Sequence, residues 1–147
     1  MNLSDIRSIL PTIVQEVTDI NYAQVIVDQS QLTEFLQKRN KDDNNMLFFV
    51  IPEYSRRGNE DSTIRVGNYQ ALIFRKYAER DSHEDFLNLM QSTEDTIKAL
   101  EEWMLLHKAQ NPCGIFAKYI DSSSLITPVW DFVSCHGHSL NFEVEKA

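Results

Sequence analysis

The sequence predicts a single α+β domain spanning residues 1–147, in which a mixed or antiparallel sheet of four to five strands packs against one long helix and one or two shorter ones. Apolar residues recur every three or four positions over 82–108, which is the period of a helix. Short apolar or alternating runs are typical of strands, and they occur at 22–27, 46–54, 63–78, 115–121 and 138–145. A length of 147 residues with 42% hydrophobic content is typical of one domain with one core.

Two shorter helices are predicted in the first forty residues. The first has an apolar stripe at helical spacing, made of Ile6, Ile9, Leu10, Ile13, Val14 and Val17. Ser4 is a candidate N-cap, and Pro11 is expected to bend this helix or delay its start because it removes a helical hydrogen bond. The second helix is predicted over 30–39, after the short strand at 22–27.

The long helix over 82–108 is the clearest element of the sequence. Its stripe consists of Phe86, Met90, Thr93, Ile97, Leu100 and Met104. Ser82 and Asp85 have the spacing of a capping box, and His107 with Lys108 in the last turn suits the helix dipole. The segment "QNPCG" is expected to end the helix.

The strand pattern leaves several segments as connections. A polar turn is expected at 40–45, followed by a central strand at 46–54 that closes at Pro52. The segment 55–62, "SRRGNEDS", contains no apolar residue and is predicted to be a charged loop. Gly67 is a possible bulge in the strand at 63–78. The segment 122–131 is predicted to be irregular or an edge.

The segment "SCHGHSLNFEVE" raises the question of a metal or catalytic site. With a period of two, His138, Leu140, Phe142 and Val144 share one strand face. His136 and His138 then lie on one side and Cys135 on the other, with Gly137 as a bulge or turn before the strand. Zinc needs three or four converging ligands, so we expect a buried cysteine and a half-buried histidine rather than a metal site.

Other catalytic arrangements are equally weak in this sequence. Motifs that position nucleophiles, phosphates or metals, such as GxSxG, GxxxxGK[ST], HExxH and GxGxxG, are absent. Cys113 could lie near His83, His107 or His136 in space, and Trp103, Tyr119 and Trp130 could line a ligand pocket. The acid pairs Glu94/Asp95 and Glu101/Glu102 are adjacent in sequence, so their side chains point in different directions on the helix. We interpret these as incidental pairs, a solvated helix face and core packing. The prediction is therefore a protein that is not an enzyme, with no catalytic, cofactor-binding or metal residues and no cofactor.

Charge and composition narrow the possible partners. The net charge is −8, and the basic residues are dispersed, with short groups only at 38–41 and 56–57. This does not suit a protein that grips duplex DNA through clustered cations. Two distant cysteines favour reduced thiols. Neither a signal peptide nor a membrane span is apparent, so we expect synthesis in a cytoplasm-like compartment and no membrane partner.

Three features of the sequence together resemble a known family. Proline closes the central strand in "FFVIPEY", the long helix contains "TEDTIKAL", and the chain closes with "PVWDFVSCHGHSLNFEVE". In element order and in these segments the sequence resembles the tail-completion, tail-terminator or neck-ring proteins of tailed bacteriophages, especially a divergent type from phages of Bacteroidetes. His138 stands where that type more usually has an aromatic residue. The resemblance covers most of the chain without an invariant motif.

The resemblance implies an α+β structural virion protein without catalytic residues. Such a protein, made in the host cytoplasm, forms a six-fold or twelve-fold homo-oligomeric ring at the tail end or neck. It contacts neighbouring portal, neck or tail proteins and lines or seals a passage for DNA without sequence-specific binding. Expected contact regions are the charged loop at 55–62 and the strand edge near 115–121. Alternatives are a subunit of a phage-like contractile injection apparatus and a cytosolic ligand-binding or accessory α+β domain.

Overall fold

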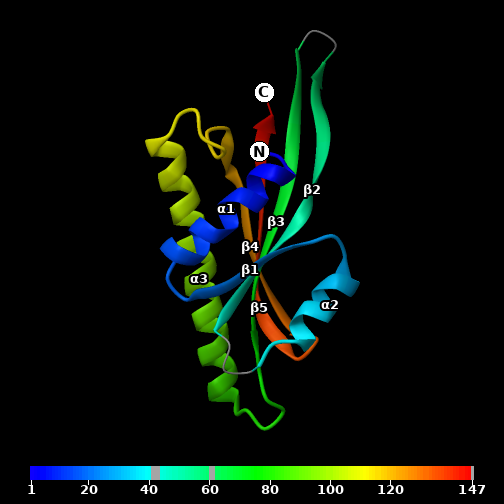
Figure 1. Ribbon diagram of the computed structural model, residues 1–147, viewed down its shortest axis with the longest axis vertical. Helices are drawn as coiled ribbons and strands as arrows, with labels where there is room; N and C mark the ends of the chain where they lie inside the picture. The colour runs from blue at the N-terminus through cyan, green and yellow to red at the C-terminus, as the bar shows by residue number, and fades with distance from the viewer. Residues whose placement is uncertain (41–43, 60–61, 147) are drawn as a thin grey trace.

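A computed structural model describes residues 1–40, 44–59 and 62–146 and shows an α+β fold (Figure 1). Its helices are α1 (Leu3–Glu16), α2 (Gln29–Gln37) and α3 (His83–Gln110), and its strands are β1 (Ile20–Ile26), β2 (Asn45–Asn59), β3 (Ser62–Lys76), β4 (Tyr119–Phe132) and β5 (Cys135–Lys146). The strands form one mixed sheet of order β1-β2-β3-β5-β4. Only β1 runs parallel to its neighbour, and the other pairs are antiparallel. The predicted fold class is confirmed.

Helices cover one face of the sheet and part of the other. Helices α1 and α3 pack on one face, here called the α1/α3 face, and α2 packs on part of the opposite face, the α2 face (Figure 1). The core on the α1/α3 face centres on Phe142, whose ring stacks with Tyr69 at 5.3 Å and Tyr119 at 5.0 Å between ring centroids. On the α2 face, Leu32 and Leu36 cover a smaller cluster that includes Phe48 and Phe74.

The helices follow the predicted stripes with small corrections. The N-cap of α1 is Asn2, which forms a capping box with Asp5, so the prediction of Ser4 was wrong by two residues. The helix then runs through Pro11, which lies on the exposed side. The capping box of Ser82 and Asp85 at the start of α3 is confirmed. Trp103 is also buried, beside the predicted stripe.

The main corrections concern strands. The predicted loop at 55–62 is largely strand, because β2 continues to Asn59 and β3 begins at Ser62, while residues 60–61 lie outside the described chain. Residues 115–118 form turns, and the segment 122–131 belongs to β4. Of the predicted turn at 40–45, residues 41–43 also lie outside the described chain. The strand at 46–54 is interior, but β3 is the middle strand of the sheet.

Neither predicted glycine irregularity occurs where it was expected. The bulge lies in β2 between Val50 and Glu53, whereas Gly67 pairs regularly with Tyr54 and Val144. A Cβ atom at Gly67 would lie 2.5 Å from the Tyr69 hydroxyl, so glycine makes room for that ring. Gly137 is inside β5, where a Cβ atom would lie 1.8 Å from the Ile73 carbonyl oxygen. Both glycines therefore permit close packing.

The connection between β4 and β5 is a strained two-residue turn. Val133 and Ser134 have φ angles of 50° and 57°, which is the left-handed region that a type I′ hairpin turn requires. That conformation costs an L-residue roughly 1–2 kcal/mol. Asparagine and glycine adopt it more readily, yet neither occurs here.

Ile97 provides a test of the helix phase, because it is fully buried between α3 and the sheet whereas the neighbouring Lys98 is exposed. We expect Ile97→Ala to lower the free energy of unfolding by about 2–5 kcal/mol. The control Lys98→Ala removes a solvent-screened surface ion pair with Glu94, so it should change the free energy of unfolding little. Denaturant titrations measure both values, and equal losses would contradict the phase.

Ser134 provides a test of the turn. Ser134→Gly should raise the free energy of unfolding by about 1 kcal/mol, because glycine accepts a positive φ without a steric penalty. The matched control is Ser122→Gly, an exposed serine in β4 without a positive φ, which should be destabilising. Thermal unfolding compares the two, and a loss of stability in Ser134→Gly would refute the strain.

Candidate functional site

The Cys-His-Gly-His segment lies inside β5 and its side chains separate onto the two sheet faces. Cys135 is fully buried in the cluster beneath α2, and this burial raises the pKa of its thiol to about 12. His138 instead faces α3, where its Nδ1 atom lies 2.9 Å from the hydroxyl of Thr93. In the described part of the chain, no group of three or more His, Cys, Asp or Glu residues is placed to hold a metal ion.

His136 has a structural partner at the end of the same hairpin. Its Nδ1 atom accepts a hydrogen bond from the backbone N–H of Asp131 at 2.8 Å. The imidazole ring stacks on Tyr77, with 4.0 Å between ring centroids, and makes a T-shaped contact with Phe86. The imidazole therefore ties the strained turn region to β3 and to the start of α3, and its Nδ1 lone pair is already occupied.

A polar seam runs between α3 and the sheet. Fully buried Asn45 donates through Nδ2 to the Thr96 hydroxyl at 2.6 Å, and Arg75 lies 3.5 Å from the Ser92 hydroxyl. The Oδ1 atom of Asn45 has no hydrogen-bond partner among the described residues. These groups are directional, so they define the position of α3 along the sheet more closely than apolar packing alone. Thr93 belongs to the same helix face and is completely buried, so it is inaccessible to a substrate.

The remaining candidates from the sequence do not converge on one site. The indole N–H of Trp103 donates to the Glu16 carboxylate at 2.8 Å. Tyr119 instead stacks on Phe142 in the core, and its hydroxyl lies 2.5 Å from the hydroxyl of Ser124. Burial raises the pKa of Tyr119 to about 12. Trp130 is 63% exposed on β4. The three aromatic residues therefore line no common pocket.

The acid pairs and the cysteine–histidine pairs also have separate surroundings. Glu94 pairs with Lys98, which lowers the pKa of Glu94, and Asp95 accepts from Gln91. Both contacts are local to an exposed helix surface. Cys113 lies exposed on the turn after α3. The candidate partners of Cys113 have other contacts: His83 packs against Phe86, His107 lies 3.0 Å from the Trp103 carbonyl oxygen, and His136 stacks on Tyr77.

The long hairpin of β2 and β3 is the most distinctive surface feature. Past Val50, no described strand pairs with the outer edge of β2, because β1 ends opposite that residue. Residues 54–59 and 62–67 are here called the hairpin arm. At its base β3 still pairs with β5 at Arg65, Val66 and Gly67, and beyond them the arm has two strands and projects past the helices (Figure 1). Its only long-range ion pair among the described residues joins Arg57 to Glu143 of β5, at 2.8 and 2.5 Å.

Two further arginines on the hairpin arm are directly opposed. Arg56 and Arg65 are Cα partners across the hairpin, both are exposed, and neither forms an ion pair with a residue in the described ranges. Like charges directly opposite each other destabilise a hairpin. An anionic partner would convert this repulsion into attraction.

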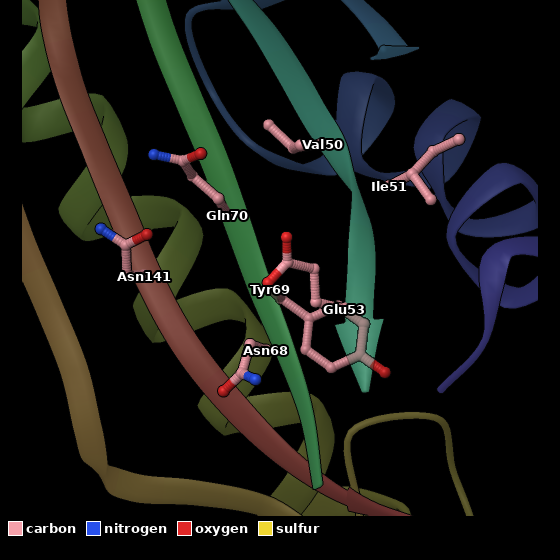
Figure 2. Close-up of a pocket in the computed structure, with 7 residues that line it drawn as sticks. All are labelled: Val50, Ile51, Glu53, Asn68, Tyr69, Gln70 and Asn141. Carbon is pink, nitrogen blue, oxygen red and sulfur yellow. The ribbon is translucent and has the colours of Figure 1, made fainter. Parts of the chain in front are cut away.

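A furrow crosses the part of the α2 face that α2 leaves uncovered. Its polar end is a hollow of about 220 Å³, where Asn68, Gln70 and Asn141 lie side by side on β3 and β5 and Glu53 reaches in from β2 (Figure 2). Its apolar end is a hollow of about 330 Å³ beside α2, lined by groups that include Leu32, Leu72 and Phe132. Val50 and Gln70 line both hollows, so the two adjoin at these residues and are together called the furrow.

The sequence indicated the charged segment but not its structure. The segment "SRRGNEDS" lacks apolar residues, so it has no periodic pattern from which a strand could be recognised. The signal that was available is the alternation in "TIRVGNYQ", which begins directly afterwards and requires an antiparallel partner. The furrow gave no signal, since its polar residues come from three strands far apart in the sequence.

Comparisons with known proteins identify no relative. The chain matches no protein-family model, no curated protein and no solved structure. Among the described residues, no helix is long and apolar enough to cross a membrane.

The two buried histidines make stability depend on pH. Burial lowers the pKa of both His136 and His138 below the usual 6.5. Below about pH 6.5 the unfolded chain therefore binds more protons than the folded one, and the free energy of unfolding falls as the pH decreases. Above that pH both imidazoles are neutral in both states, and their contribution is constant.

We expect His136→Asn with His138→Asn to flatten this dependence, because asparagine can occupy the Nδ1 position without titrating. Urea titrations at pH 7.5, 6.5 and 5.5 measure the slope, and His83→Asn, on the exposed start of α3, is the control. If the free energy of unfolding of the double variant falls between pH 7.5 and pH 5.5 as much as that of the wild type, the two histidines are not the source of the pH dependence.

Proposed function

We propose that this protein is a non-enzymatic structural virion protein that forms a ring at the neck or tail end of a tailed bacteriophage. The observation that carries the proposal is the hairpin arm, which extends beyond the helices and has an open strand edge and unpaired arginines. Among the described residues of the arm only Val66 and Gly67 are buried, so most of the arm adds nothing to the core of a monomer. A neighbouring subunit would cover both its edge and its charge.

The arrangement of secondary structure supports the same role. The sequence resembles tail-completion and tail-terminator proteins in its segments "FFVIPEY", "TEDTIKAL" and "PVWDFVSCHGHSLNFEVE". These segments form the interior strand β2, the core-facing length of α3 and the β4–β5 hairpin. The regions that carry the resemblance are thus framework elements, as expected if relatives share the fold and differ in the contacts between subunits.

A ring places specific demands on the surface of each subunit. Closed rings need a heterologous interface, in which one patch meets a different patch on the next copy. The hairpin arm supplies one such patch at one end of the molecule. The net charge of −8 also suits a ring around DNA, because like charge prevents tight binding to the phosphates. A subunit of a phage-like contractile injection apparatus would meet the same demands.

One observation favours a second function, that of a ligand-binding domain. The apolar end of the furrow, with a volume of about 330 Å³, contains two aromatic rings, Phe74 and Phe132, and could hold a small apolar molecule. The hollow is broadly open to solvent, whereas ligand sites of this kind enclose most of the ligand. The ring is therefore the better supported function.

Electron microscopy of purified particles tests the proposal. Particles from cells that produce this protein should show it as six or twelve copies around a central opening at the neck or tail end. Mass spectrometry of the same particles checks that the protein is present. Absence from the particles, or presence as single copies without cyclic neighbours, would refute the role and favour the ligand-binding alternative.

A further inference from the structure

The furrow and the hairpin arm are complementary in shape and charge. The furrow is an open sheet surface with an apolar end and an uncharged amide end, and it has one acid at each end, Asp28 and Glu53. The hairpin arm is a narrow ribbon. One face carries Arg56 and Arg65, which form no ion pair with a residue in the described ranges, and the other carries Arg57 and exposed Ile64. A two-stranded ribbon laid on a sheet face is a common form of packing, with the layers about 10 Å apart.

We infer that the furrow of one copy binds the hairpin arm of a second copy. This inference rests on the proposed ring function and names the acceptor surface for the arm. The arginines Arg56 and Arg65 lie toward the carboxylate of Glu53 of the next copy, at the polar end of the furrow, and the amides of Gln70 and Asn141 bond to polar groups of the incoming ribbon. The opposed arginines thereby gain the anionic partner that they lack among the described residues of one copy.

The chain cannot make this contact with itself. Strands β2 and β3 continue from the furrow into the hairpin arm, with one bulge in β2 between Val50 and Glu53, so the arm points away from its own furrow (Figure 1). Arm and furrow are therefore different surfaces that can meet only between copies. Repetition of this head-to-tail contact gives a ring if the rotation closes.

The available hydrogen-bonding groups of the furrow also favour a protein ribbon as the occupant. Asn68, Gln70 and Asn141 are half-buried, and their amides make no hydrogen bond to another residue in the described ranges. Each amide offers both a donor and an acceptor, which matches the alternating groups of a strand edge. A phosphate backbone would need cations in the furrow instead, and the furrow has none.

Charge reversal on the hairpin arm, and positive charge added to the furrow, test the contact. The arm variant Arg56→Glu/Arg65→Glu should weaken self-association of the full chain at least about tenfold, as reversal of close interfacial charges does. The furrow variant Gln70→Lys/Asn141→Lys should weaken it similarly by repelling the arginines. The matched control is Arg7→Glu/Arg80→Glu, two exposed arginines elsewhere with the same change in charge, which should leave association unchanged.

Sedimentation equilibrium at protein concentrations from micromolar to about 1 mM measures each variant, and circular dichroism checks that it is folded. A mixture of arm and furrow variants should associate better than either alone, because each opposed pair of surfaces now has opposite charges. Failure of the wild-type chain to associate over this range, wild-type association in the arm variant, or no gain on mixing would overturn the inference. So would binding of the arm to duplex DNA in place of self-association.

The outcomes for the inference and for the proposed function are distinguishable. Head-to-tail association in solution without a ring in phage particles would support the contact and refute the phage role. A ring in the particles whose hairpin arms contact another surface would retain the phage role and refute the contact.

Discussion

The structure depends on residues 71–74 of β3 being apolar on both faces of the strand. This strand pairs with β2 on one side and β5 on the other along most of its length. Adjacent residues such as Ile73 and Phe74 therefore pack into different cores, one beneath α1 and α3 and one beneath α2. Because the side-chain period of a strand is two, a slip of one residue would move each set of side chains into the other core, which has a different shape. The register of every other strand, and the helices that cover them, follow from this strand.

Elements with a strong period could be predicted from the sequence. The stripe of α3 requires one apolar face, and Ile97, Leu100 and Met104 are all fully buried. The row that begins at His138 was predicted from alternation alone and is buried along its length. In both cases the spacing of apolar residues is enough to identify the face that is buried. The side-chain period therefore contained enough information without knowledge of the neighbouring elements.

Segments whose structure depends on a partner could not be predicted in this way. The strand continuation at 55–59 has no apolar residue, and it is held by backbone pairing to β3 and by the bond from Arg57 to Glu143, 86 residues away. Gly137 looked like a turn residue because the sequence does not show that the Ile73 carbonyl passes close to its Cα. Likewise, the partners of His136 and His138 come from β4 and α3. Such contacts are properties of the fold rather than of any local pattern.

The bulge between Val50 and Glu53 has a consequence for the way this surface can evolve. One additional residue in β2 reverses the alternation of everything beyond it, so Arg57 reaches Glu143 on the α2 face and Arg56 lies on the opposite side. Loss of that residue would exchange the two arginines between faces without changing a single charge. A deletion of one codon near Pro52 could therefore redirect which surfaces of two molecules recognise each other, while leaving the folded core intact.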